Sequence, residues 1–163
     1  MKKWMFLLVS LFTMQVAMAD NDKPIAFEQL PATAQTFIKQ HFSNAKVAFV
    51  KMEKEFLDSS YDVVFINGDK VEFDKKGNWK EVSCRRMTVP QAVVPVKIQE
   101  FVKSNYPEAK VLKIEKDRYE YEVKLSNFWE LTFDLNFNLI DMDNDNDPRG
   151  RPGRLFARPR LAA

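Results

Sequence analysis

Apolar and polar residues alternate over residues 119–125 and 130–135, with the period of two that is typical of β-strands. One face of these strands is expected to carry apolar side chains, namely Tyr119, Tyr121, Val123, Leu125, Leu131, Phe133 and Leu135. The other face is expected to carry polar side chains, namely Glu120, Glu122, Lys124, Glu130, Thr132 and Asp134. An antiparallel sheet with one covered face and one solvent-exposed face has this pattern.

Two further segments have the 3.6-residue period of an amphipathic helix. Residues 31–42 and 95–106 each begin with a proline, which suits the first turn of a helix because its missing N–H would have no partner there. Each segment therefore predicts a helix with one apolar side.

The same order of segments occurs twice along the chain, as expected after a duplication. Residues 30–47 match residues 94–111 at an offset of 64, with Leu-Pro against Val-Pro at the start and Ala-Lys-Val at both ends. Residues 61–74 then match residues 121–134 at an offset of 60. The change of offset predicts four additional residues in the first copy, in a turn around residues 55–60.

These segments predict a single α+β domain over residues 20–147, built from two repeats at about 27–84 and 94–143. Two helices are expected on one face of an antiparallel sheet of seven or eight strands. The other face of the sheet is expected to be open.

The first nineteen residues have the features of a secretory signal peptide. Lys2 and Lys3 precede an apolar run over residues 4–14, and Ala17 and Ala19 are the small residues that signal peptidase accepts. We expect cleavage before Asp20 and a mature protein that is periplasmic or secreted. This apolar run is too short to span a bilayer, which needs about 20 apolar residues, and no second such run exists, so no transmembrane segment is predicted.

Charge is unevenly distributed along the chain. Of the 25 basic residues, two lie in the signal peptide and five in residues 148–163, so residues 20–147 carry 18 basic and 23 acidic side chains, a net charge of −5. An acidic body argues against nucleic acid as a partner. Residues 148–163 lack a hydrophobic period and predict a disordered basic tail, which either contacts anionic envelope lipids or polymers or has no role.

Residues with catalytic potential are few. The one cysteine, Cys84, and the one histidine, His41, lie in unrelated segments, which argues against a Cys–His nucleophile and against a zinc site. We interpret Cys84 as a small, half-buried strand residue, with an intermolecular disulfide as the alternative. We interpret His41 as a helix-terminal residue near the last carbonyls. The sequence therefore predicts a protein that is not an enzyme and uses no cofactor.

Alternating carboxylates between Asp141 and Asp147 raise the question of a calcium loop. An EF-hand loop starting at Asp141 needs glycine at its sixth position and glutamate at its twelfth, where this chain has Asn146 and Pro152. We predict no metal site and interpret the segment as the solvated end of the last strand, with a weak cation site as the alternative.

The open face of the sheet is the predicted binding surface. Val64 and Ile66 are apolar although Val63 and Phe65 already supply the core side, which indicates an interaction patch or a covered strand. The residues predicted on this surface are Asp62, Val64, Ile66, Glu72, Glu120, Glu122, Lys124, Thr132 and Asp134. Trp79 and Trp129, near turns, are aromatic anchors in this interpretation and close the ends of the core in the alternative one.

Two segments of the first copy resemble the beta-lactamase-inhibitor-like, PepSY-like family of small exported bacterial proteins. They are Phe-Ile-Lys-Gln-His-Phe-Ser-Asn-Ala-Lys-Val at 37–47 and Phe-Asp-Lys-Lys-Gly-Asn-Trp-Lys-Glu-Val at 73–82. The second copy follows the same pattern, and the resemblance covers about residues 27–143. Phe137 replaces the glycine expected there, which predicts a distorted last turn.

The resemblance implies tandem helix-plus-sheet units with an exposed sheet face that binds or inhibits a protein, and it assigns no catalytic or binding residue. We therefore hypothesise a non-catalytic binding module of the cell envelope that contacts an exported or envelope protein. One alternative is a periplasmic binder of a small ligand or polysaccharide that uses Trp79 and Trp129. Another is self-association through exposed edge strands.

Overall fold

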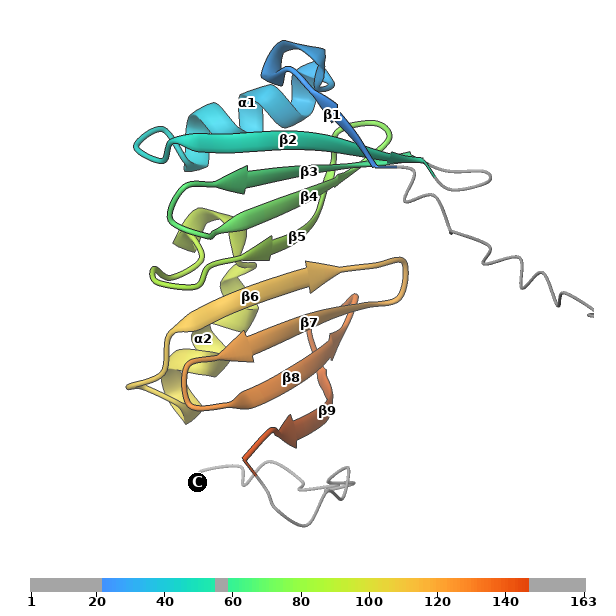
Figure 1. Ribbon diagram of the computed structural model, residues 1–163. Helices are drawn as coiled ribbons and strands as arrows, with labels where there is room; N and C mark the ends of the chain where they lie inside the picture. The colour runs from blue at the N-terminus through green and yellow to red at the C-terminus, as the bar shows by residue number, and fades with distance from the viewer. Residues whose placement is uncertain (1–21, 55–58, 147–163) are drawn as a thin grey trace, which may run out of the picture.

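A computed structural model describes residues 22–54 and 59–146. Nine antiparallel strands lie in chain order in a single sheet, and both α-helices pack on the same side of it (Figure 1). This arrangement confirms the predicted α+β class with two helices on one face. The predicted signal peptide, the turn at 55–58 and the basic tail lie outside the described residues and stay predictions.

The elements follow one another without a crossover. In chain order they are β1 (Lys23–Ile25), the 3-10 helix η1 (Phe27–Gln29), α1 (Ala32–His41), β2 (Val47–Lys54), β3 (Ser59–Phe65), β4 (Lys70–Asp74), β5 (Trp79–Ser83), the 3-10 helix η2 (Gln91–Val93), α2 (Val96–Asn105), β6 (Val111–Lys116), β7 (Glu120–Leu125), β8 (Trp129–Asp134) and β9 (Leu139–Asn144). We call η1 to β5 the first half and η2 to β9 the second half.

Each α-helix begins directly after its proline, which occupies the N-cap position rather than the first turn. A glutamine in the first turn then ties the helix to the preceding 3-10 segment. The Nε2 atom of Gln35 donates to the carbonyl of Leu30 at 3.0 Å, and the Nε2 atom of Gln99 donates to the carbonyl of Val94 at 2.6 Å. The two helices therefore enter the fold in the same way.

Aromatic residues anchor both helices to the sheet. The rings of Phe37 on α1 and Phe73 on β4 meet edge to face at 5.6 Å, and those of Phe101 on α2 and Phe133 on β8 do so at 5.3 Å. Such pairs stabilise a core by about 0.5–1.5 kcal/mol beyond the burial of their surface.

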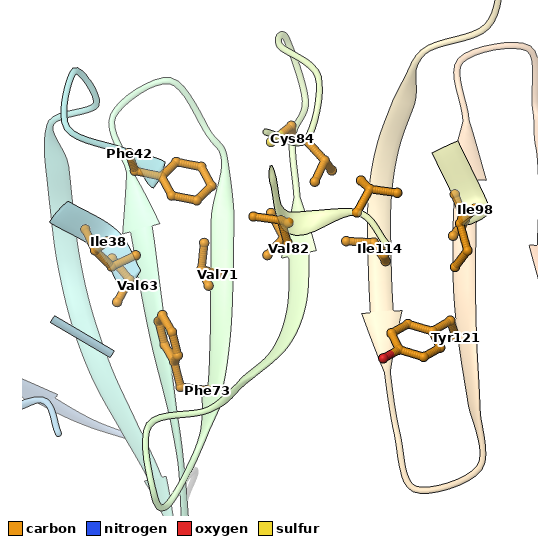
Figure 2. Packing of buried hydrophobic residues seen from close by; sticks show 14 of the residues in the cluster. Ile38, Phe42, Val63, Val71, Phe73, Val82, Cys84, Ile98, Ile114 and Tyr121 are labelled. Atoms are coloured by element: carbon orange, nitrogen blue, oxygen red, sulfur yellow. The ribbon is translucent and has the colours of Figure 1, made fainter. Parts of the chain in front are cut away.

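The core is continuous across the two halves. Val82 on β5 and Ile114 on β6 are fully buried and lie opposite each other in the sheet, so they join the two halves (Figure 2). Cys84, directly after β5, is 3% exposed and completes this junction. Burying one such side chain contributes roughly 1.5–3 kcal/mol.

The structure differs from the sequence prediction at three places. It has nine strands, because the short strand β1, which contains Pro24 and no alternating pattern, pairs with β2. Tyr119 and Leu135 were expected on the covered face, but both lie in turns outside β7 and β8 and are 74% and 48% exposed. Alternation therefore extended one residue too far at those two strand ends.

Two turns of the second half keep the backbone of their first-half counterparts although glycine is replaced. Gly68 and Gly77 have φ angles of 88° and 83°, and Phe128 and Phe137 have φ angles of 69° and 67°. The amide of Phe137 donates to the carbonyl of Asp134 at 2.9 Å, the same bond that Gly77 makes to Asp74. The last turn is therefore not distorted; Phe137 instead adopts a left-handed conformation that costs a non-glycine residue about 1–2 kcal/mol.

Candidate interaction surface

Neither helix covers one face of the sheet (Figure 1). Charged side chains form two parallel rows across this face. Along the cross-strand register from β3 to β7, one row consists of five carboxylates, the acidic row: Asp62, Glu72, Glu81, Glu115 and Glu122. The adjacent row contains three lysines, the lysine row: Lys70, Lys113 and Lys124. The residues between the rows, such as Val71 and Val82, point into the core.

The acidic row runs against an elementary rule of sheet stability. Like charges directly opposite on neighbouring strands are destabilising, whereas opposite charges stabilise by roughly 0.2–1 kcal/mol. Here Glu72 lies opposite Glu81, and Glu115 lies opposite both Glu81 and Glu122. The lysine row supplies the compensating charge from the side rather than from directly opposite.

Lys113 is the centre of this compensation. Its Nζ atom lies 3.2 Å from Glu81, 2.9 Å from Glu115 and 3.8 Å from Glu122, so one cation serves three members of the acidic row. Although burial lowers the pKa of Lys113, the hydrogen bonds and charges of Glu115 and Glu81 outweigh it and raise that pKa. Lys113 therefore stays charged at neutral pH.

Asp62 lies at the first-half end of the acidic row and is almost fully buried. Its Oδ2 atom is 3.4 Å from the Nζ atoms of both Lys51 and Lys70. Burial raises the pKa of Asp62 more than the charges of Lys70 and Lys51 lower it. With a side chain only 5% exposed, Asp62 belongs to the predicted surface by position but offers a partner little contact area.

Glu72, which lies opposite Asp62 on the neighbouring strand, remains ionised. Burial raises the pKa of Glu72, but the hydrogen bond and charge of Lys80 outweigh this effect and hold that pKa below its usual value. The Nζ atom of Lys80 is 2.8 Å from the Oε1 atom of Glu72.

An apolar patch adjoins the start of the lysine row. Phe49 on β2 lies opposite Val64 on β3 and is 51% exposed, and Ile66 follows β3 with 69% exposure. Ile66 is therefore not on a strand, and its amide donates to the carbonyl of Lys46 at 2.9 Å. We call Phe49, Val64 and Ile66 the apolar patch.

The second-half part of the surface holds the other predicted residues. Glu122 has a raised pKa, chiefly because of burial and then because of the charge of Glu130. Lys124 pairs with Asp145 and lies 4.0 Å from Glu130. Thr132 lies opposite Glu122 and extends the acidic row towards β9.

Glu120 and Asp134 lie opposite each other at the edge of this surface. The Oδ1 atom of Asp134 accepts hydrogen bonds from the backbone amides of Asn136 and Asn138, both at 2.8 Å. Asp134 is therefore engaged in shaping the β8–β9 turn.

Trp79 and Trp129 both lie on the helix side of the sheet. Trp79 and Trp129 are partly buried against the core, Trp79 with its ring 6.5 Å from that of Phe37 and Trp129 with its ring 6.0 Å from that of Tyr106. The structure thus separates them from the charged rows.

Sequence reasoning missed several members of the surface. Lys51, Lys70, Glu81, Lys113 and Glu115 follow from strand parity once the strands are known, but the alternation in β2 and β6 is weak. Phe49 was missed because β2 has a register shift between Val47 and Phe49, which no local pattern signals.

The residues with nucleophilic potential are not activated. Burial, and then the charge of Asp69, raises the pKa of the Cys84 thiol to about 12. The ring of His41 lies 4.7 Å from that of Phe37, at the end of α1. A thiol with so high a pKa is not a nucleophile at neutral pH.

Across 22–54 and 59–146, no group of three or more His, Cys, Asp or Glu side chains is placed to hold a metal ion. Asp147, the last of the alternating carboxylates, lies outside these ranges. Over the same ranges, neither helix has the length and apolar character needed to cross a membrane.

The chain is similar to solved structures of proteins that are described as periplasmic. One, from Bacteroides vulgatus ATCC 8482 and assigned to the DUF2874 family, is 63% identical with a TM-score of 0.76 and covers 77% of this chain and 99% of its own. A protein of Bacteroides thetaiotaomicron described as "putative calcium-regulated" and periplasmic is 64% identical, with the same TM-score and the same coverage. A second Bacteroides vulgatus protein, periplasmic and of unknown function, is 36% identical with a TM-score of 0.72 and covers 76% of this chain and 99% of its own.

No protein with a curated description matches the chain. The family described as "Putative beta-lactamase-inhibitor-like, PepSY-like" matches residues 17–57 and 59–141, most of the chain and nearly all of the described sheet and helices. The chain therefore belongs to this PepSY-like family.

Proposed function

We propose that this protein is a non-catalytic binding module of the cell envelope that contacts a partner protein through the acidic row, the lysine row and the apolar patch. The periplasmic descriptions of three relatives support the compartment. The inhibitor-like family description supports a role in binding.

The acidic row is the observation that carries the proposal. Five carboxylates in line across five neighbouring strands oppose sheet stability, and real proteins break such local rules mainly where function requires it. A partner with a basic stripe would face the acidic row, while the lysine row next to it would fix the register of the complex. Complementary charge patterns of this kind give specificity and fast association.

The apolar patch supplies apolar surface that the charged rows lack and that can be buried in the interface. Phe49 and Ile66 are large and more than half exposed. Exposed apolar side chains beside charged rows are typical of a contact that excludes water at its centre. The partner is therefore expected to bring an apolar group next to its basic stripe.

Affinity capture from an envelope extract tests the proposal. The full chain is compared with a variant carrying Glu115→Lys and Glu122→Lys, and with a control carrying Glu100→Lys and Glu108→Lys. The control changes net charge equally at exposed positions on and after α2. We expect the partner to be lost from the first variant and kept by the control.

Equal capture by both variants, with circular dichroism showing that both are folded, would remove the sheet face from the proposal. Because one relative is described as calcium-regulated, each capture is done with Ca²⁺ and with a chelator. A partner that is captured only in the presence of Ca²⁺ would extend that description to this chain.

A further inference from the structure

A basic groove lies at the junction of the two halves, beside the turns that connect β4 to β5 and β6 to β7. It has a volume of about 810 Å³ and is bordered by the first turns of α1, the β4–β5 turn and the β6–β7 turn. Phe37 and Trp79 contribute aromatic surface to it. Because one wall comes from each half, the groove exists only where the second half follows the first.

Positive charge predominates in this groove. Its lining includes five basic side chains, namely Lys75, Lys76, Lys80, Lys116 and Arg118, and two carboxylates, Asp74 and Asp117. Both carboxylates accept turn hydrogen bonds: Asp74 from the amides of Lys76 and Asn78 at 2.8 and 2.9 Å, and Asp117 from the amides of Tyr119 and Glu120 at 2.6 and 2.9 Å. The acids thus shape the turns, and the cations give the groove its charge.

Comparison with the second half shows that the β4–β5 turn does not need its lysines in order to form. At the offset of 60, the β8–β9 turn has Leu135 in place of Lys75, Asn136 in place of Lys76 and Ile140 in place of Lys80, and Trp79 is replaced by Leu139. The turn backbone nevertheless has the same hydrogen bonds, from Asp74 to Asn78 and from Asp134 to Asn138. Trp79 packs against the core and Lys80 pairs with Glu72 at 2.8 Å, but the turn itself forms without a lysine at the positions of Lys75 and Lys76.

We propose that this groove binds an acidic glycan, a sugar chain that carries carboxylate groups. The planar guanidinium of Arg118 matches a carboxylate in a two-bond geometry, and the lysines act as point charges around it. The rings of Phe37 and Trp79 provide the flat apolar surface that the faces of sugar rings cover. The site adjoins the surface proposed to bind a protein, because Lys80 also pairs with Glu72 of the acidic row.

An acidic peptide fits the groove less well. One common way for an extended peptide to bind is to add a strand to unpaired backbone groups. Here the turn backbones are already paired, Asp74 with Asn78 at 2.8 Å and Asp117 with Glu120 at 3.1 Å. Affinity must therefore come from side chains, as it does for a sugar chain with regularly spaced charges.

Calorimetric titration of the full chain with oligogalacturonate tests the proposal, with the methyl-esterified oligomer as the neutral probe and oligoglutamate as the peptide probe. One variant carries Lys76→Glu and Arg118→Glu, and its control carries Lys39→Glu and Lys46→Glu, an equal charge change at exposed first-half positions. We expect the first variant to lose about tenfold or more in affinity, the control to lose less than about twofold, and the neutral probe to bind no variant measurably.

Trp79→Leu, which installs the second-half residue, tests the aromatic surface. We expect it to weaken oligogalacturonate binding while melting cooperatively. If it fails to fold, the variant at Lys76 and Arg118, whose side chains are exposed, still decides the question. No binding of oligogalacturonate, equal losses in the two charge-reversal variants, or equal binding of oligoglutamate would overturn the proposal.

Discussion

On the open face, the ionised carboxylate of Asp62 is destabilising because it is buried. It is 4% exposed, and its Oδ1 atom has no hydrogen-bond partner among the described residues. Burial raises its pKa above the ordinary value of 3.8 despite the nearby lysines. The folded state therefore binds a proton at Asp62 more readily than the unfolded state does, so this group makes the protein less stable as pH rises through the window above 3.8.

Asp62→Asn is expected to raise stability at neutral pH relative to the unaltered protein. Its advantage should disappear as pH falls below 3.8, where Asp62 is protonated in both states. Urea unfolding between pH 3 and 7 measures this difference. The control is Asp134→Asn, whose carboxyl pKa is lowered, chiefly by hydrogen bonds from Asn138, and which should therefore destabilise at neutral pH. If both variants changed the free energy of unfolding at neutral pH in the same direction, the opposite pKa shifts assigned to Asp62 and Asp134 would be refuted.

For single residues, sequence reasoning placed Glu72, Glu122, Lys124 and Thr132 on the open face, where the register also puts them. The alternation of side chains between the two faces is reliable inside a regular strand. Sequence reasoning could not show that Asp62 is buried, because its burial depends on the long side chains of neighbouring strands.

At the scale of elements, the turns of the two halves have the same hydrogen bonds but differ in their demand for glycine. A Cβ atom on Gly77 would lie 2.8 Å from the Cβ atom of Pro31 and 2.9 Å from the amide nitrogen of Ala34, so α1 packs directly on this turn. A Cβ atom on Gly68 would meet only the Cδ atom of Arg85, at 3.3 Å.

Gly77→Ala should therefore destabilise more than Gly68→Ala. Both substitutions place a residue with a Cβ atom in the left-handed backbone conformation, which costs about 1–2 kcal/mol. Only Gly77→Ala also forces α1 to move. We expect a loss of about 2–4 kcal/mol for Gly77→Ala and about 1 kcal/mol for Gly68→Ala by denaturant unfolding. Similar losses would mean that α1 does not rest on the β4–β5 turn.

Phe128→Gly is expected to stabilise the protein. Phe128 is 49% exposed with a φ angle of 69°, so glycine relieves left-handed strain at little loss of packing. Since the added freedom of the unfolded chain offsets about 0.4–1 kcal/mol, a net gain of about 0.5–1 kcal/mol is expected. A clear decrease in thermal midpoint would show that the Phe128 ring has a packing role.

The shape of the β8–β9 turn could not be predicted from the sequence. The missing glycine at position 137 predicted a distorted turn, but the hydrogen bonds of Asp134 hold the turn backbone in shape. The ring of Phe137 lies 5.3 Å from that of Tyr121, a contact that offsets part of the strain.

At the scale of the whole molecule, one sheet and one core unite the two halves. Beyond the Val82–Ile114 pair, the amide of Cys84 donates to the carbonyl of Leu112 at 2.7 Å, and that of Val89 donates to Val111 at 2.9 Å. The duplicated pattern in the sequence predicted the elements, but not how closely the halves would be joined.

The two halves are therefore expected to unfold together. Trp79 reports on the first half and Trp129 on the second, so single-tryptophan variants made with Trp4→Phe and either Trp129→Phe or Trp79→Phe follow each half separately. Coincident denaturation curves are expected for a two-state domain. Two separated midpoints would show that the β5–β6 junction is weak.

Site-specific photo-crosslinking in the intact cell envelope tests the central claim, that the open sheet face contacts a partner protein. A benzophenone is attached at Thr132→Cys on the open face, or at Thr36→Cys on the exposed side of α1; Cys84 is buried and does not compete for the label. We expect a crosslinked protein from position 132 and none from position 36. Crosslinking from position 36 alone, or from neither position, would contradict the account.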